Sequence, residues 1–322
     1  MFESIWDDIK YMYRTGGSVT QLILINIAVF AGIHILALLL TPFTGIGNNA
    51  GMDAILRWTA VPSDPVELLT RPWTILTYMF LHEGFFHIIF NMLILYWFGS
   101  ILRNDLIGDH RIIPLYILGG LAGFLIYFIS ANIGTENFTK FVGGRMLGAS
   151  AGVMAIVWAA ATKAPNYRMR LILLGPVKII WIAAVLFLID IIAVRQGSNT
   201  GGHLAHIGGA VAGFLFVRQL DKGIDWGIPI HNVINWFKGL FDRDAVRSRP
   251  VRSASSRPKR RPQRSSANTG NRSRDTSAPR GQASGDSDQE RIDAILDKIK
   301  ESGYDNLTAE EKAFLYNASK RK

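Results

Sequence analysis

The sequence predicts an all-α protein that crosses a membrane several times, and three observations support this fold class. Of its 322 residues, 49% are hydrophobic. Several stretches of about 20 residues are apolar on every side, as a helix surrounded by lipid requires. The formal net charge of +10 comes from a polar, basic last third and not from these stretches. Because the chain has no cysteine, disulfides, thiolate metal sites and a cysteine nucleophile are excluded.

We expect six transmembrane helices that form one bundle within a domain of residues 18–220. Their expected ranges are 20–40, 85–102, 113–133, 147–161, 175–194 and 203–220. The fourth range is short and rich in small residues, which is typical of a helix enclosed by other helices. The segment between the first two spans contains tryptophans and prolines, and we expect it to fold against the membrane interface.

Two amphipathic segments flank this domain. Residues 1–17 carry apolar side chains at helical spacing, and this pattern fits both a helix on the membrane surface and a soluble capping helix. Residues 221–242 contain the second segment, which we expect to lie beside the membrane.

The remainder of the chain is expected to be a linker followed by a small helical unit. Residues 243–286 combine many basic residues with Ser and Pro, a composition that predicts a disordered basic linker. Residues 287–322 predict a helical hairpin. Gly303 would end its first helix, and Thr308 with Glu311 would form the capping box of the second.

The distribution of Lys and Arg favours a cytosolic location for both termini. With this topology the second, fourth and sixth spans run in the same direction, so their first turns share one depth. Ser150 lies in the first turn of the fourth span and His206 in the first turn of the sixth, while His82 and His87 lie at the start of the second. We therefore expect these side chains to meet in the outer third of the membrane.

A serine and a histidine at one depth in a membrane favour hydrolytic chemistry, because polar groups are costly to place there. Histidine can remove the serine proton near neutral pH, which makes Ser150 the candidate nucleophile and His206 the candidate base. The Ser150 amide, His87 and Asn91 are candidate donors to the oxyanion. His87 and Asn91 are four residues apart and therefore share one helical face.

Small residues at four-residue spacing are expected to let the fourth and sixth helices approach closely. Gly148 and Gly152 form one such pair, and Gly209 and Gly213 form the other.

These elements together resemble the rhomboid family of intramembrane serine proteases over roughly residues 18–220. They are the segment from His82 to Asn91, Gly148-Ala149-Ser150, and Ala205-His206 followed by Gly209 and Gly213. The resemblance implies a bacterial, six-span form with a cytosolic C-terminal tail. It further implies Ser150 as nucleophile, His206 as general base without an aspartate, and an oxyanion hole that includes His87 and Asn91.

The sequence departs from the family pattern at three positions. Ala151 replaces the glycine that usually follows the serine, and Met154 stands where an aromatic ring often packs on the histidine. Thr74 replaces the arginine of a Trp-Arg pair in the first long loop.

Other polar residues suggest rival functions. A zinc-binding helix needs histidines four apart, whereas His82 and His87 are five apart and would point about 140° from each other. We interpret His82 as a hydrogen-bonding partner of the long loop and His203 as a supporting or solvent-facing residue. Asp190 could serve ion transport, but it lies near the end of its helix, close to Arg195, and no second carboxylate accompanies it. We therefore interpret it as snorkelling or paired.

The resulting hypothesis is an intramembrane serine endopeptidase of the bacterial inner membrane that needs no metal or cofactor. The expected partners are transmembrane protein substrates, anionic lipid for the basic tail, and a second copy or another protein for the C-terminal hairpin. Nucleic acid is disfavoured because the basic run lacks aromatic residues. The alternative is a catalytically inactive rhomboid-like factor that binds membrane proteins.

Overall fold

The computed structural model divides the chain into two compact units, Met1–Val251 and Arg252–Lys322. The described residues are 2–44, 50–133, 144–171, 174–197, 199–241, 292–299, 307–308, 310–312 and 314–315. The predicted basic linker and Gly303 lie outside them.

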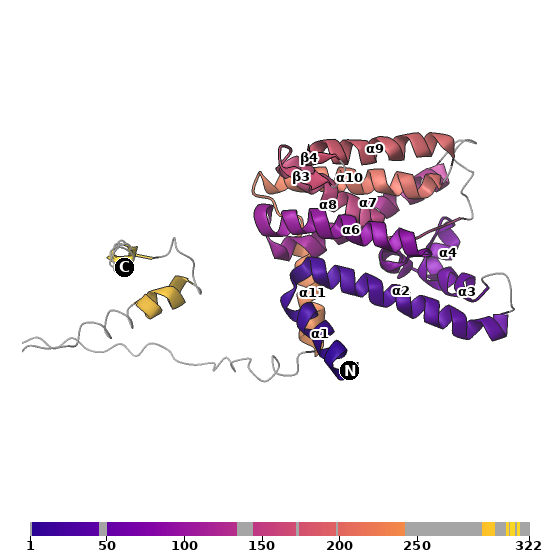
Figure 1. Ribbon diagram of the computed structural model, residues 1–322, viewed down its shortest axis with the longest axis horizontal. Coiled ribbons are helices and arrows are strands. Elements are labelled where there is room, and N and C mark those ends of the chain that lie inside the picture. The colour runs from indigo at the N-terminus through magenta and orange to yellow at the C-terminus, as the bar shows by residue number, and fades with distance from the viewer. Residues whose placement is uncertain are drawn as a thin grey trace, which may run out of the picture. The chain divides into compact units, whose positions relative to one another are not determined.

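The first unit is a helical bundle (Figure 1), and the protein is an all-α polytopic membrane protein, as predicted. Among the described residues, five helices are long and apolar enough to span a membrane. They are α2 (Gly17–Thr44), α6 (Phe85–Ile101), α7 (Ile112–Ile133), α9 (Ile179–Gln196) and α10 (Thr200–Leu220). The fourth expected span is a shorter apolar helix, α8 (Ser150–Lys163). The count of six spans therefore stays a prediction.

Helix α8 lies inside the bundle and packs against α6, α7, α9 and α10. Most of its residues are buried, and many of them are alanine, glycine or valine. Small side chains let the neighbouring backbones come close on every side. This enclosure explains why the helix that carries Ser150 is short and has no apolar face reserved for lipid.

Two helices begin later in the chain than predicted. Residues Gly175–Lys178 form strand β4, which pairs antiparallel with β3 (Arg168–Leu171), so helix α9 begins only at Ile179. Gly148 lies before α8 with a φ of 131°, a value that glycine adopts readily and other residues avoid. Both segments are rich in apolar and small residues, so their composition did not show where each helix begins.

The segment after α2 is structured and lies at the end of the bundle opposite the β3–β4 hairpin (Figure 1). It contains the helices α3 (Ala50–Thr59), α4 (Pro65–Thr70) and α5 (Thr74–Thr77), and the 3₁₀ helix η1 (Tyr78–Phe80). Strand β1 (Val61–Pro62) pairs antiparallel with β2 (Arg145–Met146), just before α8. The rings of Trp58 and Trp73 stack, and the Trp73 indole N–H donates to the Trp58 carbonyl at 2.7 Å. The predicted contact of this whole segment with the membrane interface stays a prediction.

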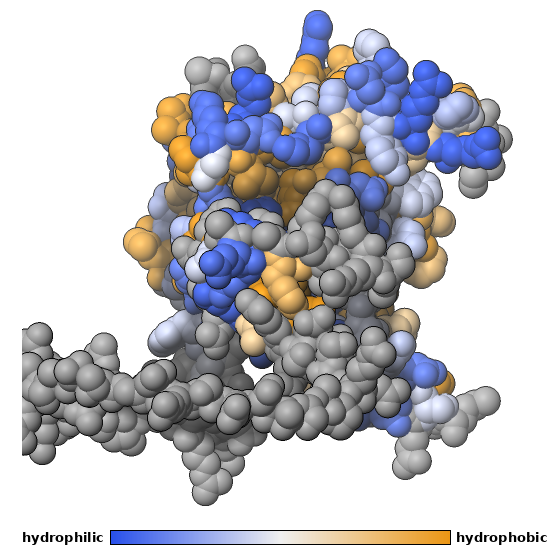
Figure 2. Space-filling view, turned by 90° about the vertical axis from the view of Figure 1, so that its left-hand side faces the viewer, coloured by the Kyte–Doolittle hydropathy of each residue, from blue (hydrophilic) through white to orange (hydrophobic). Residues whose placement is uncertain are grey.

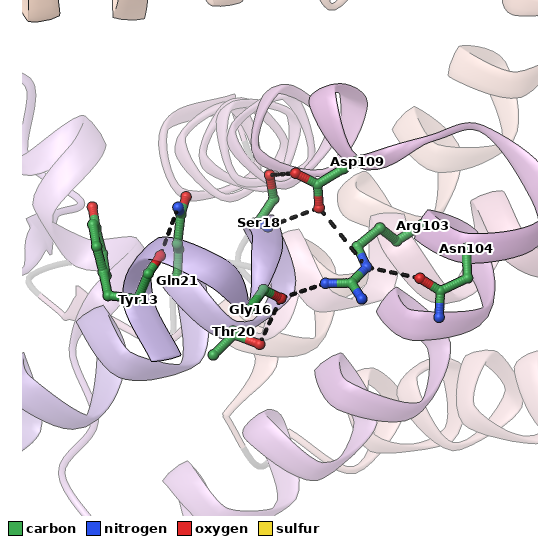
Figure 3. Close-up of polar contacts among 8 residues, drawn as sticks. All are labelled: Tyr13, Gly16, Ser18, Thr20, Gln21, Arg103, Asn104 and Asp109. Atoms are coloured by element: carbon green, nitrogen blue, oxygen red, sulfur yellow. Dashed lines mark hydrogen bonds and ion pairs between the residues drawn. The ribbon is translucent and has the colours of Figure 1, made fainter. Parts of the chain in front are cut away.

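Polar contacts tie together the end of the bundle that carries the β3–β4 hairpin. Here the helix α1 (Phe2–Thr15) leads into α2, and the short helices η2 (Leu102–Leu106) and η3 (Asp109–Arg111) join α6 to α7. The Ser18 amide and hydroxyl donate to the two oxygens of Asp109 at 2.8 and 2.9 Å (Figure 3). Arg103 donates to the Gly16 carbonyl and lies 3.8 Å from Asp109. Figure 2 looks onto this end, where hydrophilic side chains gather.

Beyond α10 the structure describes two further helical parts. Helix α11 spans Ile228–Phe241 and includes the predicted amphipathic segment. In the second unit, the Thr308 amide donates to Glu311 Oε2 at 2.7 Å and the Glu311 amide donates to Thr308 Oγ1 at 3.3 Å. This reciprocal pair confirms the predicted capping box.

Candidate active site

Ser150 is the first residue of α8, and the turn before it aims its hydroxyl at a cavity. The Gly148 amide donates to the Tyr78 carbonyl at 2.9 Å, which ties this turn to η1. The first amides of a helix lack partners within the helix, so the Ser150 N–H is free to meet an oxyanion. The cavity has a volume of about 410 Å³ and is also lined by His87, Asn91 and His206.

His206 comes from α10 and meets Ser150 directly. Its Nε2 lies 2.6 Å from Ser150 Oγ. Because α10 begins at Thr200, His206 lies in its second turn. The sequence had predicted the first turn. The meeting of serine and histidine at one depth is the arrangement that the sequence predicts.

Close packing of α10 on α8 makes this short distance possible. A Cβ on Gly209 would overlap the Ala151 carbonyl oxygen, and a Cβ on Gly213 would overlap that of Ala155. Gly152 serves a different contact, because a Cβ there would lie 2.7 Å from the Tyr116 ring of α7. The expected role of the glycines is therefore found for Gly209 and Gly213, but Gly148 and Gly152 do not face α10.

Asp190 of α9 belongs to the same cluster, and it is paired, which was one of its two interpretations, but with histidines and not with the nearby Arg195. Its Oδ1 lies 2.7 Å from His206 Nδ1 and 2.8 Å from His203 Nδ1. Asp190 is only 4% exposed, whereas Arg195 is exposed. The carboxylate therefore pairs with two histidines, and His203 shares this carboxylate with His206. This arrangement also departs from the aspartate-free site that the family resemblance implies.

The sequence held a signal for this cluster. Asp190 is the only Asp or Glu within the six predicted spans, and a lone carboxylate in a membrane requires a partner. His203 precedes His206 by three residues, which places both on one face of a helix. What the sequence lacked was the rotation of α9, which turns Asp190 toward α10.

His87 and Asn91 line the cavity from α6. A Cβ placed on Gly148 would lie 3.2 Å from His87 Nε2 and 3.4 Å from Ser150 Oγ, so these two groups flank one point. Asn91 Nδ2 donates to the His87 carbonyl at 2.8 Å and is 7% exposed. An amide nitrogen carries two hydrogens, so Asn91 keeps a second donor.

His82 lies just before α6 and is fully buried. Within the described part of the chain, neither of its ring nitrogens makes a hydrogen bond of ordinary geometry, but the ring interacts with the backbone of Phe80 in the long loop. The ring also meets the edge of the His87 ring, with 4.9 Å between centroids. Burial, reinforced by the nearby His87, lowers the pKa of His82 to about 4.

Three residues of the site are types that commonly bind metal ions. Asp190, His203 and His206 each offer one ligand atom, and these atoms lie within 4.8 Å of one another. Around a zinc ion, however, ligand atoms about 2.1 Å from the metal sit roughly 3.3 Å apart. The 2.7 and 2.8 Å separations found here are those of N–H···O hydrogen bonds.

Met154, the residue in place of an aromatic ring, also lines the cavity.

Comparison with known proteins shows that the part of the chain that carries this cluster is similar to a known domain. Residues 69–220 match the Rhomboid domain, and this range contains every residue of the site described above. The matched range is a little under half of this chain. Residues 285–321 match a family of unknown function, DUF6576.

Curated relatives of the rhomboid domain come from plants, animals and bacteria. "RHOMBOID-like protein 12, mitochondrial" from Arabidopsis thaliana is 30% identical over 162 residues, 48% of each chain. "Presenilin-associated rhomboid-like protein, mitochondrial" from Mus musculus is 28% identical over 166 residues, 51% of this chain and 41% of the relative. "Rhomboid protease GlpG" from Klebsiella pneumoniae is 25% identical over 159 residues, 48% of this chain and 53% of the relative. The chain thus spans about half the length of the relatives it matches.

Proposed function

We propose that this protein is a serine endopeptidase that cleaves membrane-anchored proteins within the membrane. The observation that carries this proposal is the 2.6 Å contact between Ser150 Oγ and His206 Nε2, made by two different apolar helices. A hydroxyl becomes a useful nucleophile when a base accepts its proton at this distance. The rhomboid domain match supports the same chemistry at the level of the family.

In the proposed reaction, His206 Nε2 accepts the Ser150 proton while Ser150 Oγ attacks the carbonyl carbon of the substrate. The resulting imidazolium then donates that proton to the leaving amine, and an acyl-enzyme remains on Ser150. His206 next removes a proton from water, and the water oxygen attacks the ester carbon. As the bond between that carbon and Ser150 Oγ breaks, His206 returns the proton to Ser150 Oγ and the acid product leaves. No other proton carrier is needed for this sequence.

We assign the oxyanion hole to the Ser150 amide, His87 and Asn91. These groups line one cavity with the nucleophile, and each can offer an N–H. Donors held in place before the reaction stabilise the developing charge without reorganising. Removal of one such donor typically lowers kcat by about 10²- to 10³-fold.

We further propose that the substrates are single-span membrane proteins and that the enzyme resides in the bacterial inner membrane. The matched relatives include proteins with mitochondrial names and one from Klebsiella pneumoniae, so they do not identify one membrane for this protein. Fractionation of the native host, with detection of the intact chain, would test this assignment.

A serine-reactive fluorophosphonate probe tests the enzyme proposal in native membranes. We expect labelling of the wild-type protein, its loss in Ser150→Ala and a loss of at least 100-fold in His206→Ala. Ser130→Ala is the matched control, because this serine lies on α7 away from the cavity and should leave labelling unchanged. Equal absence of labelling from the wild-type protein and Ser150→Ala would instead favour an inactive, rhomboid-like binding factor.

A further inference from the structure

One carboxylate oxygen in the site accepts from two imidazole rings. Asp190 Oδ1 is held by His206 Nδ1 at 2.7 Å and by His203 Nδ1 at 2.8 Å. We propose that Asp190 is a positioning residue that fixes the tautomer of His206, and that His203 holds the carboxylate in place for this task. The inference rests on the proposed function and deepens it.

The hydrogen-bond geometry allows only one neutral form of His206. A carboxylate can only accept, so His206 Nδ1 must carry the proton of the 2.7 Å bond. A neutral imidazole then has its lone pair on Nε2, which is the nitrogen that lies 2.6 Å from Ser150 Oγ. The opposite tautomer would place a hydrogen between Nε2 and the serine oxygen and could not remove the serine proton.

Burial explains why two donors are present. An unpaired carboxylate inside a membrane protein is costly, and Asp190 is only 4% exposed. A single bond from His206 would tie the carboxylate to the group that changes charge during catalysis. The bond from His203 stays in place at each step, so Oδ1 remains aimed at His206 while the base gains and loses its proton.

The helices position these groups without help from loops. Asp190 projects from α9, whereas His203 and His206 lie three residues apart on α10 and present one face. The two hydrogen bonds of Asp190 therefore also hold α9 against α10. The competing explanation is that these bonds only stabilise the helix pair. It predicts that removing the carboxylate lowers the stability of the protein without changing the tautomer of His206.

Asp190→Asn is the test variant, because it keeps the size of the side chain and removes its charge. The asparagine amide can donate to His206 Nδ1 and so favours the wrong tautomer. We expect kcat on a transmembrane substrate in detergent micelles to fall about 100-fold, with KM changed less than twofold. His203→Gln should retain most activity, since it keeps an N–H donor, whereas His203→Leu should lose about fivefold.

The tautomer is measured directly by the ¹⁵N chemical shifts of labelled histidine in the full-length protein in lipid vesicles. His206→Gln identifies the relevant pair of signals. We expect the Nδ1–H form in the wild-type protein and a substantial Nε2–H population in Asp190→Asn. The inference is overturned if the wild-type ring is in the Nε2–H form, or if Asp190→Asn leaves both tautomer and kcat unchanged. It is also overturned if the variant lowers the unfolding temperature and the rate while the tautomer stays as in the wild type.

This design separates the two proposals. Absence of probe labelling from the wild-type protein would refute the protease, whereas the ¹⁵N measurement would still decide the tautomer. Normal labelling of the wild-type protein with an unaffected Asp190→Asn variant would refute only the role of Asp190.

Discussion

Histidines in this protein differ in what they contact, and those contacts decide their chemistry. His206 bridges Ser150 and Asp190, His203 holds the same carboxylate, and His87 borders the cavity. His82 is buried and makes no hydrogen bond of ordinary geometry within the described residues. Residue type alone therefore says little about role here, because burial and partners set proton affinity and orientation.

We predict that His82 makes the stability of the protein sensitive to acid. Its pKa is lowered from the ordinary 6.5 to about 4, so between these values the unfolded chain binds a proton that the folded protein does not. The free energy of unfolding is therefore highest above pH 6.5, and it decreases by at most about 3 kcal/mol as the pH falls toward 4. In thermal unfolding between pH 7.5 and 4.5, His82→Phe should lose less stability than the wild type. Parallel pH profiles would contradict this assignment.

At the scale of elements, the site depends on how closely α8 and α10 approach. The two helices pack extensively, and Gly209 and Gly213 put the α10 backbone against carbonyl oxygens of α8. Helices in lipid associate through such contacts, because lipid removes most of the hydrophobic driving force between them. The same contact that stabilises the bundle therefore also sets the distance from Ser150 to His206.

We predict that Gly209→Ala separates these helices and impairs catalysis. Its methyl group would overlap the Ala151 carbonyl, so α10 must shift and the 2.6 Å contact must lengthen. Since a misplacement of about 1 Å can cost about 100-fold, we expect probe labelling to slow by at least ~10-fold. Gly32→Ala is the control, because a Cβ at this helical position meets nothing within 4 Å. Equal labelling rates for the two variants would show that the close approach is not required.

At the scale of the whole molecule, the site and the C-terminal unit belong to different parts of the chain. Every site residue lies in Met1–Val251, and the match to a family of unknown function lies in residues 285–321. The capping box and the Lys298–Glu311 ion pair at 2.7 Å are local to the second unit. All the residues named for the site therefore belong to the first unit.

We predict that a chain ending at Val251 keeps Ser150-dependent probe labelling within about twofold of the full-length rate, because none of the groups in the site is removed. Labelling rates of both chains in the same membranes, normalised to protein amount, provide the measurement. A loss of labelling with a normal unfolding temperature would assign an activating role to the C-terminal unit.

The sequence by itself determined the membrane class, the candidate pair Ser150 and His206, and the capping box at Thr308 and Glu311. Those features depend on composition and on spacing along one helix, which a single chain records directly. It also carried the lone carboxylate Asp190, but not its partners. Local spacing has no information about how one helix is rotated against the next.

The tertiary structure decided the rest. It turned Asp190 toward His203 and His206, moved the start of α9 to Ile179 behind a β-hairpin, and directed Gly152 at α7 instead of α10. Each of these outcomes depends on the relative rotation and depth of separate helices, which are set by how their small and large side chains interlock. Only the folded bundle brings the Asp190 carboxylate to His206 Nδ1.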